Sequence, residues 1–339
     1  MPLRGLRRVA LGMVGAVMFA SGANAGSPWL SFDAPGSWLT QAYAINGHNL
    51  IVGQCQNPAT FWSCGFLRTK DGTLTIFDAP DANQGTTAIG VNDAGDITGS
   101  FVFFTDLQYT QSYVRHPDGT FEEFAVNGLR WTVAAAINDQ GTVIGYAQGN
   151  RTSPKAFLRK ADGKSEIFLR NTDGSYAKSI NRRGAITGCY MRDGLMHGFV
   201  RGTAGKITTF DPPGSINTQP ASINDKGEIT GLYTGEDYFN HGFLREPDGT
   251  ITTFDAPNAA SQGTLPMAIG PDGDIAGIFY DDANNYHGFV RDRAGTIHRI
   301  DVPGQFSTAI LGISPTGKVV GYDVEGHAVR GYQRVWRRN

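Results

Sequence analysis

The chain has 339 residues, with 29 Lys and Arg against 31 Asp and Glu. A mildly acidic chain without a basic run is unsuited to nucleic acid or an anionic membrane surface, so neither is expected as a partner. Glycine accounts for 45 residues, about twice the usual share, and the 18% of charged residues lies below the usual ~25%. This balance is typical of turn-rich all-β proteins.

The first 25 residues are predicted to be a cleavable export signal. Arginines precede a short apolar stretch at Val9–Ala20, and Ala23-Asn24-Ala25 matches a cleavage site. The apolar stretch is too short to span a bilayer, and no later stretch is long enough, so no membrane span is expected. We therefore expect a periplasmic or secreted protein cleaved after Ala25, with Arg7-Arg8 leaving the twin-arginine route open.

A repeat of about 45 residues fills the rest of the chain, in the range of propeller blades. The phrase Phe-Asp-Ala-Pro or a variant of it marks seven starts, at Phe32, Phe77, Phe124, Phe168, Phe210, Phe254 and Ile300. Each repeat has four short segments with alternating patterns, separated by turn residues such as Asn92-Asp93-Ala94-Gly95. Such segments are predicted to be strands.

The segments have their own signatures. The first ends in a small and a β-branched residue, as in Ala44-Ile45, and the second reads β-branched-x-Gly, as in Ile51 to Gly53. The third reads aromatic-x-Arg, as in Phe66 to Arg68, and the fourth reads Ile-Thr-Thr-Phe-Asp in its fullest form. The seven arginines, one per repeat, are expected to pack or hydrogen-bond between neighbouring repeats.

These signatures predict an all-β fold: a seven-bladed β-propeller with four antiparallel strands per blade, formed by residues 26–339 as one domain. The last repeat supplies three strands, and the segment Trp29 to Asp33 is a spare fourth strand. Pairing the N-terminal strand with the C-terminal repeat would close the ring and remove both open edges. An open solenoid or a differently grouped sheet is the alternative.

Three phrases together resemble the bacterial extracellular HAF-repeat family: His197-Gly-Phe-Val-Arg, Asn224-Asp225-x-Gly and Phe254-Asp-Ala-Pro. The resemblance spans essentially the whole chain after residue 25. It implies an exported repeat protein of unsettled activity, and it brings no catalytic residues with it.

The cysteines and histidines are predicted to be structural. Cys55 and Cys64 flank one hairpin, and export allows them to form a disulfide, whereas Cys189 is expected to be a buried thiol rather than a nucleophile or ligand. His197, His241 and His287 resemble a metal set, but hairpin register places them opposite Asp211, Asp255 and Asp301 as cross-strand pairs. The Asn-Asp-x-Gly turns lack the spacing of calcium loops. No metal and no cofactor are expected.

Binding is expected where the repeats differ, in the second-to-third and fourth-to-first connections. The aromatic candidates there are Trp38, Trp62, Trp131, Tyr109, Tyr238, Tyr280 and Tyr286. The carboxylate candidates are Asp106, Glu236, Asp237, Asp281 and Asp282. Aromatic rings beside carboxylates suit sugars or an extended peptide, although ordinary solvated loops have the same composition.

The sequence favours an exported, monomeric binding module that recognises a glycan or a cell-surface protein. The alternative is a carbohydrate-active enzyme, a glycoside hydrolase or polysaccharide lyase, using loop carboxylates at the channel mouth. A purely structural repeat protein is the third possibility. No nucleophile elbow, phosphate-binding loop or zinc-protease motif occurs, so the sequence identifies no catalytic residues and an enzyme is the less favoured interpretation.

Overall fold

The computed structural model describes residues 29–260, 262–326 and 328–336. The predicted signal segment, residues 1–25, lies outside them. The first strands are β1 (Trp29–Phe32), β2 (Leu39–Ile45), β3 (Ile51–Gln56), β4 (Ser63–Arg68), β5 (Leu74–Phe77), β6 (Thr86–Val91), β7 (Ile97–Phe104), β8 (Gln108–Arg115), β9 (Phe121–Phe124), β10 (Trp131–Ile137), β11 (Val143–Gln148), β12 (Lys155–Arg159) and β13 (Ser165–Ile167). A short 3-10 helix, η1 (Val126–Gly128), lies between β9 and β10.

The remaining strands follow the same order. They are β14 (Gly174–Ile180), β15 (Ile186–Arg192), β16 (Leu195–Arg201), β17 (Ile207–Phe210), β18 (Ser215–Ile223), β19 (Ile229–Gly235), β20 (Asn240–Arg245), β21 (Ile251–Phe254), β22 (Thr264–Ile269), β23 (Ile275–Tyr280), β24 (Tyr286–Arg291), β25 (Ile297–Ile300), β26 (Ser307–Ile313), β27 (Lys318–Glu325) and β28 (Ala328–Val335). The prediction of an all-β chain is therefore confirmed.

The predicted fold class, a closed seven-bladed ring of separate four-stranded blades, is corrected by the hydrogen bonding. Over the described ranges the strands form five sheets, two of eight strands and three of four, and none closes on itself. The larger sheets arise because single parallel pairs, Leu39↔Val329 and Trp131↔Thr110, join neighbouring sets of strands. The predicted grouping is therefore wrong, and the pairing is not purely antiparallel.

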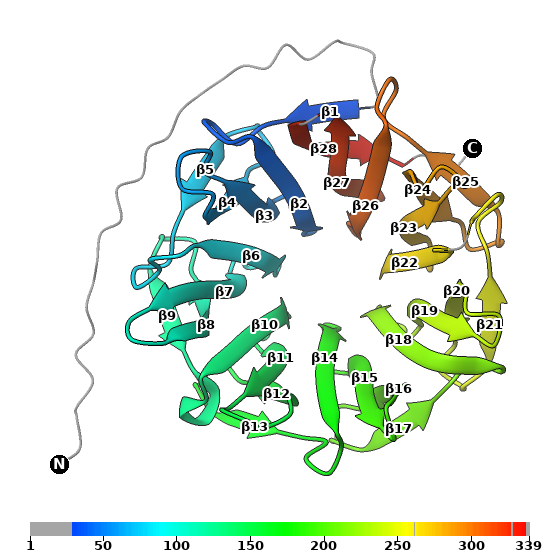
Figure 1. Ribbon diagram of the computed structural model, residues 1–339, viewed down its shortest axis with the longest axis horizontal. Coiled ribbons are helices and arrows are strands. Elements are labelled where there is room, and N and C mark those ends of the chain that lie inside the picture. The colour runs from blue at the N-terminus through cyan, green and yellow to red at the C-terminus, as the bar shows by residue number, and fades with distance from the viewer. Residues whose placement is uncertain (1–28, 261, 327, 337–339) are drawn as a thin grey trace.

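The strands lie around a common centre in a propeller-type arrangement, with β2, β6, β10, β14, β18, β22 and β26 nearest to it (Figure 1). The N-terminal strand β1 pairs antiparallel with β28, from Trp29↔Arg334 to Phe32↔Gly331. This confirms the pairing expected between the N-terminal strand and the last repeat. The two ends of the described chain are thereby tied together.

The repeat glycine on each second strand exists because the first strand passes very close to it. A Cβ built on Gly53 would lie 1.9 Å from the carbonyl oxygen of Gln41, and one on Gly99 would lie 1.8 Å from that of Thr87. Register shifts interrupt the β2–β3 and β6–β7 pairings at these points. Only glycine fits such an approach. The aromatic of each third strand then fills the core, and all seven are fully buried: Phe66, Tyr113, Phe157, Phe199, Phe243, Phe289 and Tyr332.

The repeat arginines join neighbouring strand sets, as predicted. The Arg68 guanidinium lies 4.9 Å from the centre of the Phe32 ring, and Arg115 lies 5.0 Å from Phe77. The arginines of the next four repeats stack in the same way on the aromatic residue of the preceding fourth strand. Because Ile300 offers no ring, Arg334 stacks on Trp29 of β1 instead, at 4.6 Å. The first six of these cation–π contacts hold adjacent sets together, whereas Arg334 and Trp29 are cross-strand partners within one set.

A second link runs through the Asn-containing turns. The Asn46 side-chain amide donates to the Asn92 carbonyl at 2.8 Å, and Asn92 donates to the Asn138 carbonyl at 3.1 Å. Asn138, Asn181 and Asn224 continue the series, which reaches the Gly270 carbonyl. Arg182 adds ion pairs with Asp93 and with Asp139, the latter at 3.0 Å. The turn chemistry was predicted, but these links between repeats were not.

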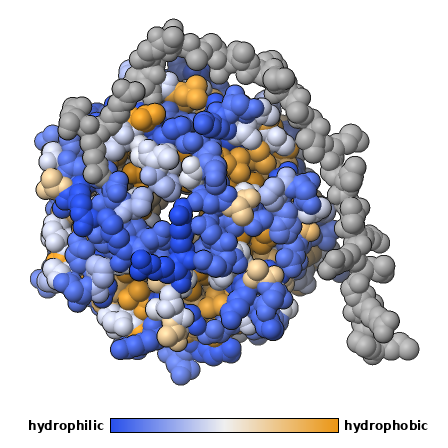
Figure 2. All heavy atoms as spheres, turned by 180° about the vertical axis from the view of Figure 1, so that it is seen from behind, coloured by the Kyte–Doolittle hydropathy of each residue, from blue (hydrophilic) through white to orange (hydrophobic). Residues whose placement is uncertain are grey.

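The reverse side of the molecule is mostly hydrophilic around its centre, with hydrophobic residues showing between the polar ones (Figure 2). Within the part of the chain that the structure describes, no helix has the length and apolar character needed to cross a membrane.

Candidate binding site

One cross-strand position differs in chemistry from repeat to repeat. It joins the residue two places after the second-strand glycine to its partner on the third strand. The pairs are Cys55↔Cys64, Phe101↔Gln111, Ala147↔Lys155, Tyr190↔His197, Tyr233↔His241, Phe279↔His287 and Asp323↔Arg330. In five repeats an aspartate directly follows the fourth strand, at the position that register places opposite the third-strand member of this pair.

The predicted histidine–aspartate pairs are confirmed. His197 Nδ1 lies 2.8 Å from the Asp211 carboxylate, His241 Nδ1 lies 3.0 Å from that of Asp255, and His287 Nδ1 lies 3.1 Å from that of Asp301. Each imidazole also packs on the ring of its β-strand partner, as Tyr233 does on His241 at 5.1 Å between ring centres. The histidines are therefore part of the fold. Among the described residues, no group of His, Cys, Asp and Glu side chains is placed to hold a metal ion.

The predicted disulfide is present. Cys55 on β3 and Cys64 on β4 are bonded, with their Cα atoms 4.9 Å apart. Cys189 is a free, buried thiol, as expected, and burial raises its pKa. The disulfide occupies the place that a ring and a histidine fill in three other repeats.

A cavity of about 320 Å³ lies beside this disulfide. It is lined by Pro35, Gly36, Ser37, Asn57, Thr60, Trp62, Ser63, Cys64, Ile76, Asp78, Ala82, Asn83 and Gly85. These residues come from the loop after β1, the β3–β4 loop with the start of β4, the end of β5, and the β5–β6 loop. The lining therefore combines one large aromatic ring with hydroxyl, amide and carboxylate groups, as small-molecule sites do.

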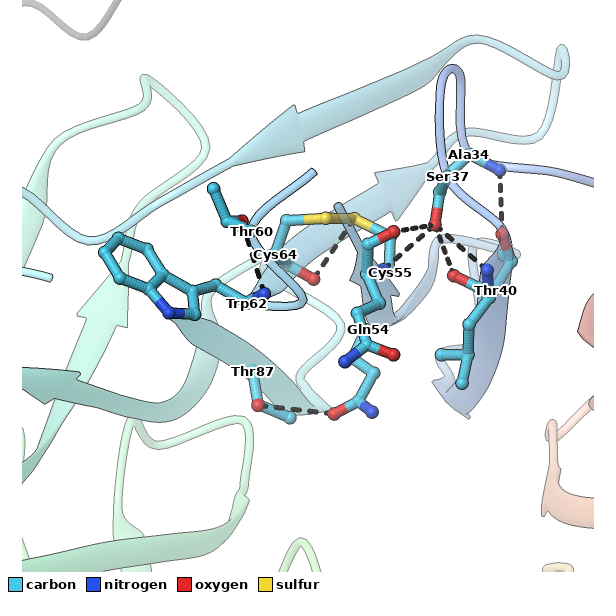
Figure 3. The surroundings of a disulfide bond; sticks show 11 residues. Ala34, Ser37, Thr40, Gln54, Cys55, Thr60, Trp62, Cys64 and Thr87 are labelled. Carbon is cyan, nitrogen blue, oxygen red and sulfur yellow. Dashed lines mark hydrogen bonds between the residues drawn. A yellow bond between two sulfur atoms is a disulfide. The ribbon is translucent and has the colours of Figure 1, made fainter. Parts of the chain in front are cut away.

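Short hydrogen-bonded loops hold the cavity open. The Ser37 hydroxyl donates to the Gln56 carbonyl and accepts from the Gln56 amide, both at 2.9 Å, which ties the loop after β1 to the end of β3. The β3–β4 loop is closed by the Asn57 amide donating to the Trp62 carbonyl at 3.0 Å. Figure 3 shows the Trp62 indole directed away from the disulfide, and this side chain is 47% exposed. The loop thus presents a free aromatic face.

The far wall of the cavity depends on Gly85, which has a φ of +120°. It forms a parallel bridge with Ser63, and a Cβ at this position would lie 2.9 Å from the Ser63 amide nitrogen and carbonyl oxygen. Next to it, Asn83 exchanges two hydrogen bonds with the Phe104 backbone, at 2.8 and 2.9 Å. The end of β7 therefore supports the wall.

Asp78 is the charged group of the cavity. It is the aspartate of the second Phe-Asp-Ala-Pro phrase, and its carboxylate faces a cysteine where three other repeats have histidine. Asp78 is exposed to solvent as a residue, but partial desolvation of its carboxylate raises its pKa, opposed by a hydrogen bond with the Thr86 side chain. No residue of the described lining is basic. The site therefore has one carboxylate without a cation beside it.

Of the residues predicted to bind a ligand, only Trp62 lines this cavity, together with Cys64 of the predicted disulfide. Trp38 is 41% exposed in the loop after β1, outside the lining. Trp131 and Tyr109 both pack on Arg130, at 4.6 and 5.2 Å from its guanidinium. A third aromatic group lies in the last repeats, where Tyr286 contacts the rings of Tyr280 and Tyr322, each at 6.0 Å.

The predicted carboxylates do not join the cavity either. Asp281 lies 3.0 Å from His287 Nε2, and the hydrogen bond lowers its pKa to about 2. Asp237 lies 3.2 Å from His241 Nε2, and its pKa is lowered first by the Phe239 amide and then by this histidine. Asp106, Glu236, Asp282 and Tyr238 are exposed on three loops, Glu236 and Tyr238 sharing the loop between β19 and β20. The predicted set is thus dispersed over several loops.

Four polar residues of the cavity were not predicted from the sequence, namely Asn57, Thr60, Asp78 and Asn83. One signal was present: the second Phe-Asp-Ala-Pro phrase retains its aspartate although Cys64 replaces the histidine that faces it elsewhere. Because this repeat keeps the aspartate and lacks the histidine, Asp78 is expected to have a different role from the aspartates of the other repeats.

No family model matches this chain, and no curated protein matches it by sequence. Solved structures do match. A virginiamycin B lyase from Staphylococcus aureus, with quinupristin, is 14% identical with a TM-score of 0.60, covering 91% of this chain and 99% of its own. TolB from Acinetobacter baumannii is 14% identical with a TM-score of 0.54, covering 78% of this chain and 66% of its own. YCF48 bound to D1 peptide is 12% identical with a TM-score of 0.54, covering 93% and 97%.

Together with the strand arrangement, these matches define the fold class as all-β and of propeller type. At such identities the likeness concerns the fold alone, and it assigns no ligand.

Proposed function

We propose that this chain is an exported, monomeric binding module of propeller type that takes a glycan in the cavity beside Trp62. The observation that carries the proposal is the cavity itself. A half-exposed indole stands at its edge, and hydroxyl and amide groups of Ser37, Asn57, Thr60 and Asn83 line it.

The composition of the cavity suits a sugar. The apolar face of a sugar ring packs on a flat indole, which gives up little conformational entropy because its side chain has two rotatable bonds. The surrounding amides and hydroxyls match the hydroxyls of the ring as donors and acceptors. A cavity of about 320 Å³ lies at the lower end of the usual range for small-molecule sites. It therefore accommodates a short stretch of a glycan rather than a folded partner.

Export is supported by two features of the chain. The Cys55–Cys64 disulfide persists in oxidising compartments and is rare in the reducing cytosol. The N-terminal residues have the charge and apolar pattern of an export signal. The resemblance to the extracellular HAF-repeat family agrees with this location and remains part of the proposal.

The carboxylates favour binding over glycoside hydrolysis. A general acid in this reaction needs a raised pKa, so that it is protonated at neutral pH. Asp281 and Asp237 have lowered values because histidines and backbone amides bind their charged forms. Asp78 does have a raised pKa, but it is the one carboxylate among the residues that line the cavity, whereas hydrolysis uses a pair.

The proposal is tested by calorimetric titration of the protein with a panel of oligosaccharides. The variant Trp62→Ala should weaken the best ligand by at least about tenfold, since a lost stacking contact corresponds to roughly 1.4 kcal/mol. Trp38→Ala is the matched control, because it removes an exposed tryptophan of the same face that lies outside the cavity. Equal affinity in wild type and Trp62→Ala, or loss of binding only in Trp38→Ala, would refute the site.

A further inference from the structure

We propose that the ligand of this cavity carries a protonated amine, and that Asp78 binds it; the glycan is then an amino sugar with a free amino group. This inference rests on the proposed function and specifies its ligand class. It follows from a comparison of the repeats, from the charge of the cavity, and from the position of Trp62.

The repeats show that an aspartate at this position otherwise has a histidine or arginine partner. Asp211, Asp255 and Asp301 contact histidines within 3.1 Å, and Asp33 lies 3.7 Å from Arg330. In the two remaining repeats the aspartate is replaced by Ala125 and Leu169, and no histidine faces them. Among the five aspartates, Asp78 alone has no ion pair within the ranges that the structure describes.

Asp78 lacks a histidine partner because the Cys55–Cys64 disulfide occupies the position of the pair. Cys64 stands where histidine stands in three other repeats, and its sulfur is bonded to Cys55 rather than directed at the carboxylate. The space that an imidazole would fill belongs to the cavity, which both Cys64 and Asp78 line. A ligand amine would therefore take the place of the missing imidazole.

The charge of the cavity supports a cation. No lining residue is basic, so the carboxylate of Asp78 is the one formal charge in the lining. A neutral ligand would cover this carboxylate and leave it without a counter-charge, which is costly. Asp78 is exposed in the free protein, so a ligand that fills the cavity would desolvate its carboxylate further, and a bound amine would lower the raised pKa of Asp78. The face of the Trp62 ring can also make a cation–π interaction with a protonated amine, which a neutral group cannot make.

The experiment compares two ligands that differ only at nitrogen. We would titrate the protein with a tetramer of glucosamine and with the tetramer of N-acetylglucosamine at pH 6, where the free amine is largely protonated. The structure predicts at least tenfold tighter binding of the free-amine tetramer. This preference should shrink as salt is raised, because the contact is an ion pair near solvent.

The variant Asp78→Asn should bind both tetramers with similar affinity, while Asp106→Asn, an exposed loop carboxylate outside the lining, should keep the preference. A second variant, Cys55→Ala with Cys64→His, rebuilds the histidine–aspartate pair of the other repeats and should lose the free-amine ligand. Thermal melts establish that each variant is folded.

The outcomes separate the two proposals. Equal affinity for both tetramers, with binding still dependent on Trp62, overturns the amine assignment and leaves the glycan site intact. A preference for amines that survives in Asp78→Asn also overturns the assignment. Binding of a simple alkylamine as tight as that of the free-amine tetramer, unaffected by Trp62→Ala, supports the role of Asp78 and overturns the glycan. Failure of both tetramers and of the whole panel overturns both proposals.

Discussion

At the scale of single residues, the cross-strand position after the second-strand glycine decides the chemistry of each repeat. A disulfide, an aromatic–histidine pair or an aspartate–arginine pair occupies the same place in otherwise similar surroundings. The backbone tolerates these exchanges because the buried ring of the third strand and the glycine beneath it stay constant. Variation at one pair can therefore create a site without disturbing the fold.

Asp323 is the clearest case of strain at this position. It is 1% exposed, and neither carboxylate oxygen has a hydrogen-bond partner in the described chain. Burial raises its pKa to about 6, above the usual 3.8. The folded state therefore holds the proton more tightly than the unfolded state does, and its stability falls as pH rises between these two values.

We predict that Asp323→Asn raises the melting temperature at pH 7.5 and has no such benefit at pH 4. The full effect is at most about 3 kcal/mol, at 1.36 kcal/mol for each pKa unit. Thermal melts of both proteins across this pH range provide the measurement. A variant that is less stable than wild type at pH 7.5 would show that the charged carboxylate is satisfied in solution.

The pKa of His241 is also raised, but here the charged form is stabilised rather than penalised. Burial alone would lower its pKa, but hydrogen bonds with Asp255 and Asp237 outweigh this and raise the pKa above 6.5. Its contribution to stability is therefore complete below pH 6.5 and is lost as pH rises through the raised value.

We predict that His241→Gln destabilises the protein by on the order of 1 kcal/mol at pH 5.5 and by less at pH 8.5. Urea unfolding at the two pH values measures the difference. His48→Gln, at an exposed position of the β2–β3 turn, serves as the control and should show no such dependence. A loss that is the same at both pH values would mean that packing on Tyr233, not charge, is what His241 contributes.

At the scale of elements, the cavity is a product of loops rather than of strands. Gly85, in the β5–β6 loop, is the cavity residue whose backbone least tolerates a side chain. Its φ is +120°, and a Cβ there would collide with the Ser63 backbone. Gly36 lines the same cavity with a φ of +71°, but a Cβ there would meet no atom within 4 Å. Both glycines have a positive φ, but only at Gly85 would a Cβ collide with a neighbouring residue, Ser63.

We predict that Gly85→Ala costs roughly 1–3 kcal/mol in stability, as expected for strained backbone, and weakens ligand binding by moving Ser63. Gly36→Ala should cost about 1 kcal/mol and leave affinity within twofold. Denaturant unfolding and ligand titration of both variants test this. Comparable affinities for the two would show that the Ser63 wall plays no part in binding.

The elements were largely predictable from sequence, and the site was not. Alternating patterns bounded by glycine turns gave the strands, and hairpin register placed His197 opposite Asp211. The grouping of strands into sheets was not predictable, because it depends on single parallel contacts such as Leu39↔Val329 that no repeated residue marks. The cavity was missed because it comes from a local exception to the repeat, visible only once Asp78 and Trp62 are placed in space.

At the scale of the whole molecule, β1 links the ends of the described chain. Phe32 is buried against Phe66 at 6.0 Å between ring centres, and Arg68 of β4 stacks on the same ring. Trp29 contacts Tyr332 of β28 at 5.2 Å. Side chains of β1 thus pack in the hydrophobic cores of both the first and the last repeat.

We predict that deleting residues 29–33 destabilises the protein by several kcal/mol, since it exposes an edge and removes at least one buried aromatic side chain. A melting temperature that does not move would refute this role. Phe32→Ala, which leaves the strand in place, should give a smaller loss in the same direction.

The central claim is that one cavity of a propeller-type scaffold binds an amine-bearing glycan. A crystal structure grown with the free-amine tetramer tests it most directly. We expect a sugar ring packed against the Trp62 indole, with its amine within hydrogen-bond distance of the Asp78 carboxylate. A tetramer bound elsewhere, for example among Tyr280, Tyr286 and Tyr322, with the cavity beside the disulfide unoccupied, would contradict it.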